Sequence, residues 1–191
     1  MTTATLEKSA KVAMNGVDVP ALLGTIGAVG QNPDLARFQF RATGAWKAGT
    51  HSAAEINGFF GAGQEHTRAS SFVVEGDHPA VLCGADKAPT PVEYLLSALA
   101  ACITAGIGNI AAARQIALSK VTTTVTGDVD LQGLLGLDPE VRNGFQSIRA
   151  TVEIEGDADA EGLAGIVKQS VARSAVFDML KNGTEVEVSL A

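Results

Sequence analysis

Residues 90–114 read TPVEYLLSALAACITAGIGNIAAAR, and this stretch decides the fold. Thr90, Pro91 and Glu93 match a capping box, with a hydroxyl before the helix, proline at its first position and an acid at its third. Leucine and isoleucine then recur at helical spacing, while alanine and glycine fill most other positions. The pattern predicts a helix that is apolar around nearly its whole circumference, and such a helix is buried on most sides.

The segments before this helix predict a short helix followed by strands. Residues 19–29 are apolar but interrupted by glycine and proline, which predicts a short helix in an N-terminal extension of residues 1–34. From residue 37, apolar and polar residues alternate, as in strands with one buried face. This alternation predicts strands over 37–42, 51–60 and 71–75, with a hairpin turn at 47–50.

The segments after the helix complete an α+β domain of residues 35–191. Alternation predicts two more strands, and Asp157 or Asp159 can cap a following helix. These elements are strands over 121–131 and 148–154, helices over 163–171 and 174–181, and a last strand over 185–190. Ser174 is predicted to cap the second of these helices by accepting a backbone N–H of its first turn. The order β-β-β-α-β-β-α-α-β is an α+β arrangement. Its small sheet covers one side of the central helix, so a second subunit is the natural cover for the other.

Composition excludes several classes of protein. The 191 residues suffice for one domain with a modest extension, and 46% are hydrophobic, which excludes wholesale disorder. A net charge of −7 without a Lys/Arg cluster argues against binding to nucleic acid or to anionic membranes. The longest apolar run, residues 94–113, is interpreted as a core helix because Ser97, Thr104 and Asn109 interrupt it.

The N-terminal sequence and the two cysteines predict a cytoplasmic protein. Residues 1–8 lack the apolar stretch of a secretory signal. Free thiols are then expected at both Cys83 and Cys102. The histidines His51, His66 and His78 have no metal-ligand spacing, so neither a metal nor another cofactor is expected.

Cys102 is the residue most suited to carry chemistry. It lies on the apolar face of the predicted helix, where a cysteine can simply be a small buried hydrophobic residue. It can also be a nucleophile, if an Arg, a Lys or a helix N-terminus near the sulfur favours the thiolate. Glu93 precedes it by nine residues, a rotation of about 180° on a helix with 3.6 residues per turn. Glu93 therefore cannot touch Cys102 within the helix, and is interpreted first as the partner of Thr90.

Two stretches of the chain resemble the OsmC/Ohr family, the osmotically inducible and organic hydroperoxide resistance proteins. The first is VLCGADKAPTPVEYLLSALAAC, residues 81–102, which resembles the family's central helix. The second is RSAVFDML, residues 173–180, which resembles the segment that opens a late helix with Cys-Pro-Val. The resemblance extends over about residues 37–191. It implies an OsmC-like fold and an intertwined homodimer in which β-sheets of both chains enclose the two central helices.

The resemblance also implies a thiol-dependent reduction of organic hydroperoxides at the dimer interface. Cys102 falls on the cysteine that attacks the peroxide, and Ser174 falls on the cysteine that resolves the resulting sulfenic acid as a disulfide. The glutamate that supports the attacking thiol falls on Val92, next to Glu93. The supporting arginine lies near the first hairpin, where Arg41 and Lys47 are the candidates. No disulfide can form at Ser174, so a working enzyme here would need an external thiol reductant.

Two functions are therefore expected. The first is a one-cysteine hydroperoxide reductase in which Cys102 is the nucleophile, with Glu93 as a second catalytic candidate and Arg41, Lys47 and Ser174 in support. The second is a non-catalytic homodimer that binds an apolar small molecule at the interface, with Cys102 only lining the pocket. A group that stabilises the Cys102 thiolate favours the first hypothesis, and a dry apolar pocket favours the second.

Overall fold

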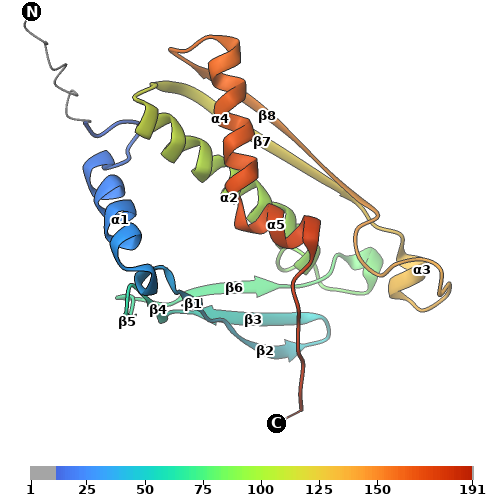
Figure 1. Ribbon diagram of the computed structural model, residues 1–191. Coiled ribbons are helices and arrows are strands. Elements are labelled where there is room, and N and C mark those ends of the chain that lie inside the picture. Colours follow the sequence, from blue (N-terminus) through green and yellow to red (C-terminus); the bar gives the residue numbers. More distant parts are fainter. Residues whose placement is uncertain (1–11, 191) are drawn as a thin grey trace, which may run out of the picture. The chain divides into compact units, whose positions relative to one another are not determined.

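The computed structural model describes residues 12–190 (Figure 1). The described chain divides into two compact units, one of residues 12–24 and 99–190 and the other of residues 25–98. Both contain helices and strands, which confirms the predicted α+β class. The predicted boundary after residue 34 stays a prediction, and residues 1–11 of the predicted extension lie outside the described residues.

Unit 25–98 carries the first six strands, which form two antiparallel three-stranded sheets. One sheet has the order β2-β3-β6 and the other β1-β4-β5. The strands are β1 (Gln39–Phe40), β2 (Thr43–Ala48), β3 (His51–Ile56), β4 (Phe59–Gly61), β5 (Gln64–His66) and β6 (Phe72–Gly76). The β2–β3 hairpin turns at Gly49, whose φ of 60° suits glycine.

Two of the strand predictions for this unit were wrong in detail. The predicted strand 37–42 is reduced to β1, and the predicted strand 51–60 is divided between β3 and β4, which belong to different sheets. Asn57 lies at the division. Its side chain donates to Ser71 and accepts the N–H of Arg68, and these bonds end the strand pairing at this residue. A short polar side chain that bonds the backbone nearby competes with sheet pairing in this way.

Asp77 organises the loop between β6 and the central helix. Its buried carboxylate accepts hydrogen bonds from the Thr50 hydroxyl at 2.6 Å and from the N–H groups of His78 and Lys87. The Thr50 hydrogen bond above all lowers the pKa of Asp77, to about 2, although burial opposes the shift. The loop includes the short helix η2 (Ala80–Leu82), and Cys83 follows it, exposed.

The central helix α2 (Pro91–Arg114) begins as predicted. The backbone N–H of Thr90 donates to the Glu93 carboxylate at 2.9 Å, which is the side-chain bond that a capping box supplies. By length and hydropathy α2 could cross a membrane, and the same properties are typical of a core helix. Its buried face packs in a core with Ile166 of a later helix, as a core helix does.

Unit 12–24 with 99–190 is built on the antiparallel hairpin of β7 (Leu118–Asp128) and β8 (Ser147–Gly156). The helix α4 (Ala160–Arg173) lies beside α2 and in front of this hairpin, and α5 (Ala175–Asn182) follows it (Figure 1). The core lies between these elements and is formed by Leu99, Ile103, Ile107, Ile110, Ala111 and Ile166. The short helix α1 (Val19–Gln31) and the 3₁₀ helix η1 (Pro33–Ala36) belong to the N-terminal part of the chain.

Small residues let α4 approach α2. A Cβ atom added at Gly106 would lie 2.3 Å from Ser170 Oγ, so only glycine leaves room there. The buried Ser170 hydroxyl donates to the carbonyl of Ile103 at 2.7 Å. Asp159 caps α4 by accepting the Gly162 N–H, which decides between the two predicted caps.

Two further predictions for this unit were wrong. Leu131 does not end a strand but begins the short helix α3 (Leu131–Leu134), because Asp130 accepts the Gln132 N–H and caps it. Residues 185–190 alternate as predicted, yet they form no strand. A strand needs a second strand to accept its backbone hydrogen bonds, and the described chain offers none to this segment. Val188 is accordingly 93% exposed.

Candidate active site at Cys102

Cys102 lies on α2, half-buried, at the point where the chain passes from α4 to α5. Ser174 separates these two helices because its backbone is extended, with φ −75° and ψ 115°. Its hydroxyl accepts the N–H of Phe177 at 3.1 Å and so caps α5, as the sequence predicted. The same hydroxyl lies 3.1 Å from Cys102 Sγ. The structure therefore brings together two of the predicted site residues that are 72 positions apart.

Hydrogen bonds around the sulfur favour the thiolate. Burial raises the pKa of the Cys102 thiol, but hydrogen bonds from the Ser174 hydroxyl and from the N–H groups of Val176 and Ala175 outweigh it. The pKa of Cys102 therefore lies below its ordinary value. The donors belong to the first turn of α5, where backbone N–H groups have no partner within the helix and attract negative charge. The thiolate is the reactive form of cysteine, so this geometry favours the reactive form of Cys102, and its role as a nucleophile stays a prediction.

Glu93 has a local role in the structure. Its carboxylate accepts the Thr90 N–H, and α2 is one continuous helix in which Glu93 and Cys102 face opposite sides. This bond accounts for Glu93 as a cap of α2. A catalytic role for Glu93 stays a prediction.

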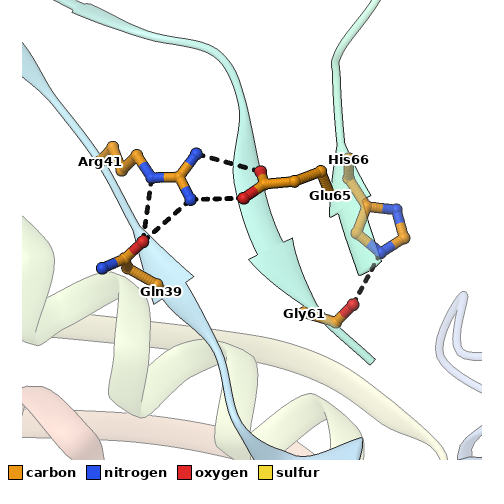
Figure 2. A network of polar contacts seen from close by, with 5 residues as sticks. All are labelled: Gln39, Arg41, Gly61, Glu65 and His66. Atoms are coloured by element: carbon orange, nitrogen blue, oxygen red, sulfur yellow. Dashed lines mark hydrogen bonds and ion pairs between the residues drawn. The ribbon is translucent and has the colours of Figure 1, made fainter. Parts of the chain in front are cut away.

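Arg41 is part of a polar network in unit 25–98 (Figure 2). Its guanidinium donates to both carboxylate oxygens of Glu65, at 2.7 and 3.0 Å, and to the side-chain oxygen of Gln39. The hydrogen bond with Glu65 raises the pKa of Arg41 and lowers that of Glu65. The charge of Arg41 is thus balanced within its own unit. Lys47 lies exposed on β2, and a role for either residue at Cys102 stays a prediction.

The histidines show no metal centre. His66 Nε2 lies 3.0 Å from the Gly61 carbonyl oxygen (Figure 2). The His66 ring also stacks on Phe59. Within residues 12–190, no group of three or more His, Cys, Asp or Glu side chains could hold a metal ion.

An apolar hollow lies elsewhere in the same unit. It measures about 520 Å³ and lies between β8 and α4. Its lining consists of Val152, Ile154, Ala160, Leu163, Ala164, Val167 and Lys168. Cys102 is not part of this lining, so the hollow is not a pocket at the thiol.

Sequence reasoning missed the Ala175 and Val176 N–H groups. A signal was available, because Ser174 was predicted to cap the last helix and a helix N-terminus was named as a group that could favour a thiolate. The family resemblance paired residue 174 with residue 102, but nothing in the local sequence indicated that the first turn of the last helix points its N–H groups at the sulfur.

Comparison with known proteins then identifies the family. The family of OsmC-like proteins matches residues 84–189, a segment that contains both Cys102 and Ser174. The chain belongs to the OsmC-like family. No curated protein matches it.

Solved OsmC-like structures share the fold at low sequence identity. An OsmC-like protein from Mycoplasma pneumoniae is 19% identical, with a TM-score of 0.56 over 75% of this chain and 87% of that one. A Legionella pneumophila protein, described as an organic hydroperoxide resistance protein OsmC, is 16% identical. Its TM-score is 0.54 over 76% of this chain and 90% of that one. These similarities confirm the OsmC-like fold expected from the sequence.

Proposed function

We propose that this OsmC-like protein reduces organic hydroperoxides in a one-cysteine cycle, with Cys102 as the nucleophile. The observation that carries the proposal is the placement of Cys102 Sγ 3.1 Å from Ser174 Oγ, at the first turn of α5. This environment lowers the pKa of the thiol, as the nucleophile of such a reaction requires. The Legionella pneumophila protein of the same fold, described as an organic hydroperoxide resistance protein, supports this choice of substrate.

The proposed cycle consumes one hydroperoxide and two thiols. The Cys102 thiolate attacks the terminal peroxide oxygen, the O–O bond breaks, and the alkoxide takes up a proton and leaves as an alcohol. Cys102 is then a sulfenic acid. An external thiol attacks its sulfur, releasing water and forming a mixed disulfide. A second thiol attacks this disulfide, which returns Cys102 to the reduced state and releases the oxidised reductant.

The need for an external reductant follows from the presence of serine, not cysteine, at position 174. Its hydroxyl lies where a resolving sulfur would be needed, next to Cys102 Sγ, and a hydroxyl cannot form a disulfide. The second cysteine, Cys83, lies exposed in the loop after η2. We therefore propose a thiol from outside the protein as the resolving group, in the cytoplasm, where small and protein thiols are kept reduced.

The first test is chemical trapping of the oxidised cysteine. Stoichiometric cumene hydroperoxide with dimedone present should label Cys102 within seconds, as seen by peptide mass spectrometry. Cys83→Ser should keep this labelling and the turnover with an added dithiol, whereas Cys102→Ser should lose both.

A Cys102 that stays reduced under excess hydroperoxide would overturn the proposal. It would favour a protein that binds an apolar small molecule. The sequence placed that ligand at the dimer interface beside Cys102, and the hollow between β8 and α4 is a different apolar surface that does not include Cys102. A fluorescent fatty-acid analogue that binds with micromolar affinity, and loses it in Leu163→Glu, would then identify that function.

We also propose that the protein works as a homodimer. The buried residues of α2, apart from Ala112 near its end, lie on one face, and Ala101, Ala105 and Asn109 on another face are exposed in the single chain. Small side chains allow a second helix to approach closely. The exposed, alternating segment 185–190 likewise lacks a strand partner within the described chain. A second copy would satisfy both features.

Light scattering at micromolar concentration should therefore give twice the chain mass of 19.5 kDa. Ala105→Arg places a long charged side chain on the exposed face of α2 and should shift the protein toward the monomer. Lys181→Ala, a surface change on α5, is the control and should remain a dimer. A wild-type protein that is monomeric and folded at this concentration would contradict the proposal.

A further inference from the structure

We propose that Ser174 is a positioning residue for Cys102, which it serves by donating its hydroxyl hydrogen to the Cys102 sulfur. The inference concerns the same cysteine on which the proposed function rests. It goes beyond that function, because it assigns the activation of the thiol to a neutral side chain at the place where the family resemblance puts a second cysteine.

The contacts of Ser174 determine the direction of its hydrogen bond. A serine hydroxyl has one hydrogen to donate, and its oxygen can accept others. The Ser174 oxygen accepts the Phe177 N–H at 3.1 Å, so the hydroxyl hydrogen points away from the helix. The acceptor in reach is Cys102 Sγ, at 3.1 Å. The cap of α5 therefore aims the hydroxyl at the sulfur.

The backbone holds Ser174 in this orientation. Its N–H donates to the Val171 carbonyl at 3.2 Å, and its carbonyl accepts the Asp178 N–H at 3.0 Å. Ser174 is only 4% exposed, so water has little access to compete for the hydroxyl. The side chain is thus fixed by both helices that it joins, α4 before it and α5 after it.

No charged side chain shares this task in the described part of the chain. The causes that shift the pKa of Cys102 are burial, Ser174 and two backbone N–H groups, all of them neutral. The carboxylates of Glu93 and Asp178 are bonded to Thr90 and Asn182, and the guanidinium of Arg114 to Gln169. None of the other charged residues on the surrounding helices and strands shifts the pKa of Cys102 either. These residues are Glu161, Lys168, Arg173, Lys181, Lys120, Asp128, Arg149, Glu153 and Glu155.

The test measures the reactivity of Cys102 toward iodoacetamide between pH 5 and 10. All variants carry Cys83→Ser, so the measured rate belongs to Cys102. Ser174→Ala removes the hydroxyl and should move the midpoint of the pH profile upward, which slows alkylation at pH 7 by about tenfold, the usual worth of a hydrogen bond to a charged group. Ser174→Thr keeps both the cap and the hydroxyl and should restore the parent profile.

A matched control separates this effect from the loss of a helix cap. Asp159→Ala removes the cap of α4, where Asp159 accepts the Gly162 N–H at 2.8 Å. It should lower the Tm by a few degrees, as Ser174→Ala does, without moving the pH midpoint. If Ser174→Ala fails to fold, Ser174→Gly replaces it, because glycine is tolerated at a cap and also lacks the hydroxyl.

Two results would overturn the assignment. One is a pH profile in Ser174→Ala or Ser174→Gly that matches the parent, and the other is an upward shift in Ser174→Thr as large as in Ser174→Ala. Alkylation requires no hydroperoxide, so the assignment and the proposed function are tested apart. A Ser174-dependent profile with no reaction toward hydroperoxide would refute the function and leave the positioning role standing.

Discussion

Ser174→Cys should convert Cys102 into one half of a disulfide. The Ser174 oxygen lies 3.1 Å from Cys102 Sγ, and a disulfide needs its sulfur atoms about 2.0 Å apart, so a shift of about 1 Å closes the bond. In the variant, the sulfenic acid formed by a hydroperoxide meets a neighbouring thiol and loses water to it. Because the two groups are held together, its lifetime should fall by several orders of magnitude.

Mass spectrometry distinguishes the outcomes. After stoichiometric hydroperoxide, the wild-type protein should gain one oxygen at Cys102, while Ser174→Cys should lose two hydrogens and yield a peptide linking residues 102 and 174. Excess hydroperoxide should drive the wild-type protein on to sulfinic acid and leave the variant protected. Ser119→Cys adds a third cysteine at an exposed site on β7 and should behave like the wild type. Dimedone labelling of Ser174→Cys at the wild-type level would refute this prediction.

Gly106→Ala should damage both the fold and the site. The added Cβ would lie 2.3 Å from Ser170 Oγ, and Ser170 has no freedom to turn away because it bonds the Ile103 carbonyl inside the core. Relief requires α4 to move away from α2, and overpacking of this kind costs about 1–3 kcal/mol. Ser174 follows α4 directly, so the movement would also withdraw its hydroxyl from Cys102.

The matched control for this change is Gly165→Ala on α4. An added Cβ there meets only Arg114 Nη1 at 3.7 Å, an ordinary contact, and alanine suits a helix better than glycine. Urea unfolding should show a large loss of stability for Gly106→Ala and a small gain for Gly165→Ala. The iodoacetamide rate at Cys102 should fall in the first variant alone. Equal stability of the two variants would show that the contact between α2 and α4 is looser than described.

The parts of this structure that depend on neighbouring residues were predictable. Thr90 with Glu93, and Ser174 with Phe177, are contacts three residues apart, and each follows from the chemistry of helix termini. The length of α2 followed likewise from its apolar periodicity. The cap of α3 at Asp130 is equally local, but the alternating pattern of the preceding strand continues to residue 131 and predicted a strand there instead.

The parts that depend on distant residues were not predictable from local pattern. Residues 185–190 have the alternation of a strand, but a strand exists only where a second one accepts its hydrogen bonds. The approach of Ser174 to Cys102 depends on Gly106 and Ser170, which set the distance between two helices far apart in sequence. The family resemblance predicted that residues 102 and 174 lie together, and the direction of their hydrogen bond depends on the cap at Phe177, which only the folded structure shows.

The division of the chain has a consequence for its synthesis. Asn15 bonds the carbonyl of Ile116 and the N–H of Leu118, the latter 103 residues later, and Val12 bonds Gln115 in the same place. A ribosome adding 5–20 residues per second needs about 5–20 s to make that interval. During this time residues 25–98 can pair all their strands, because every partner strand lies within them. The N-terminal segment can form its hydrogen bonds only after residues 115–118 have been made. Residues 25–98 can therefore fold before residues 12–15 find their partners.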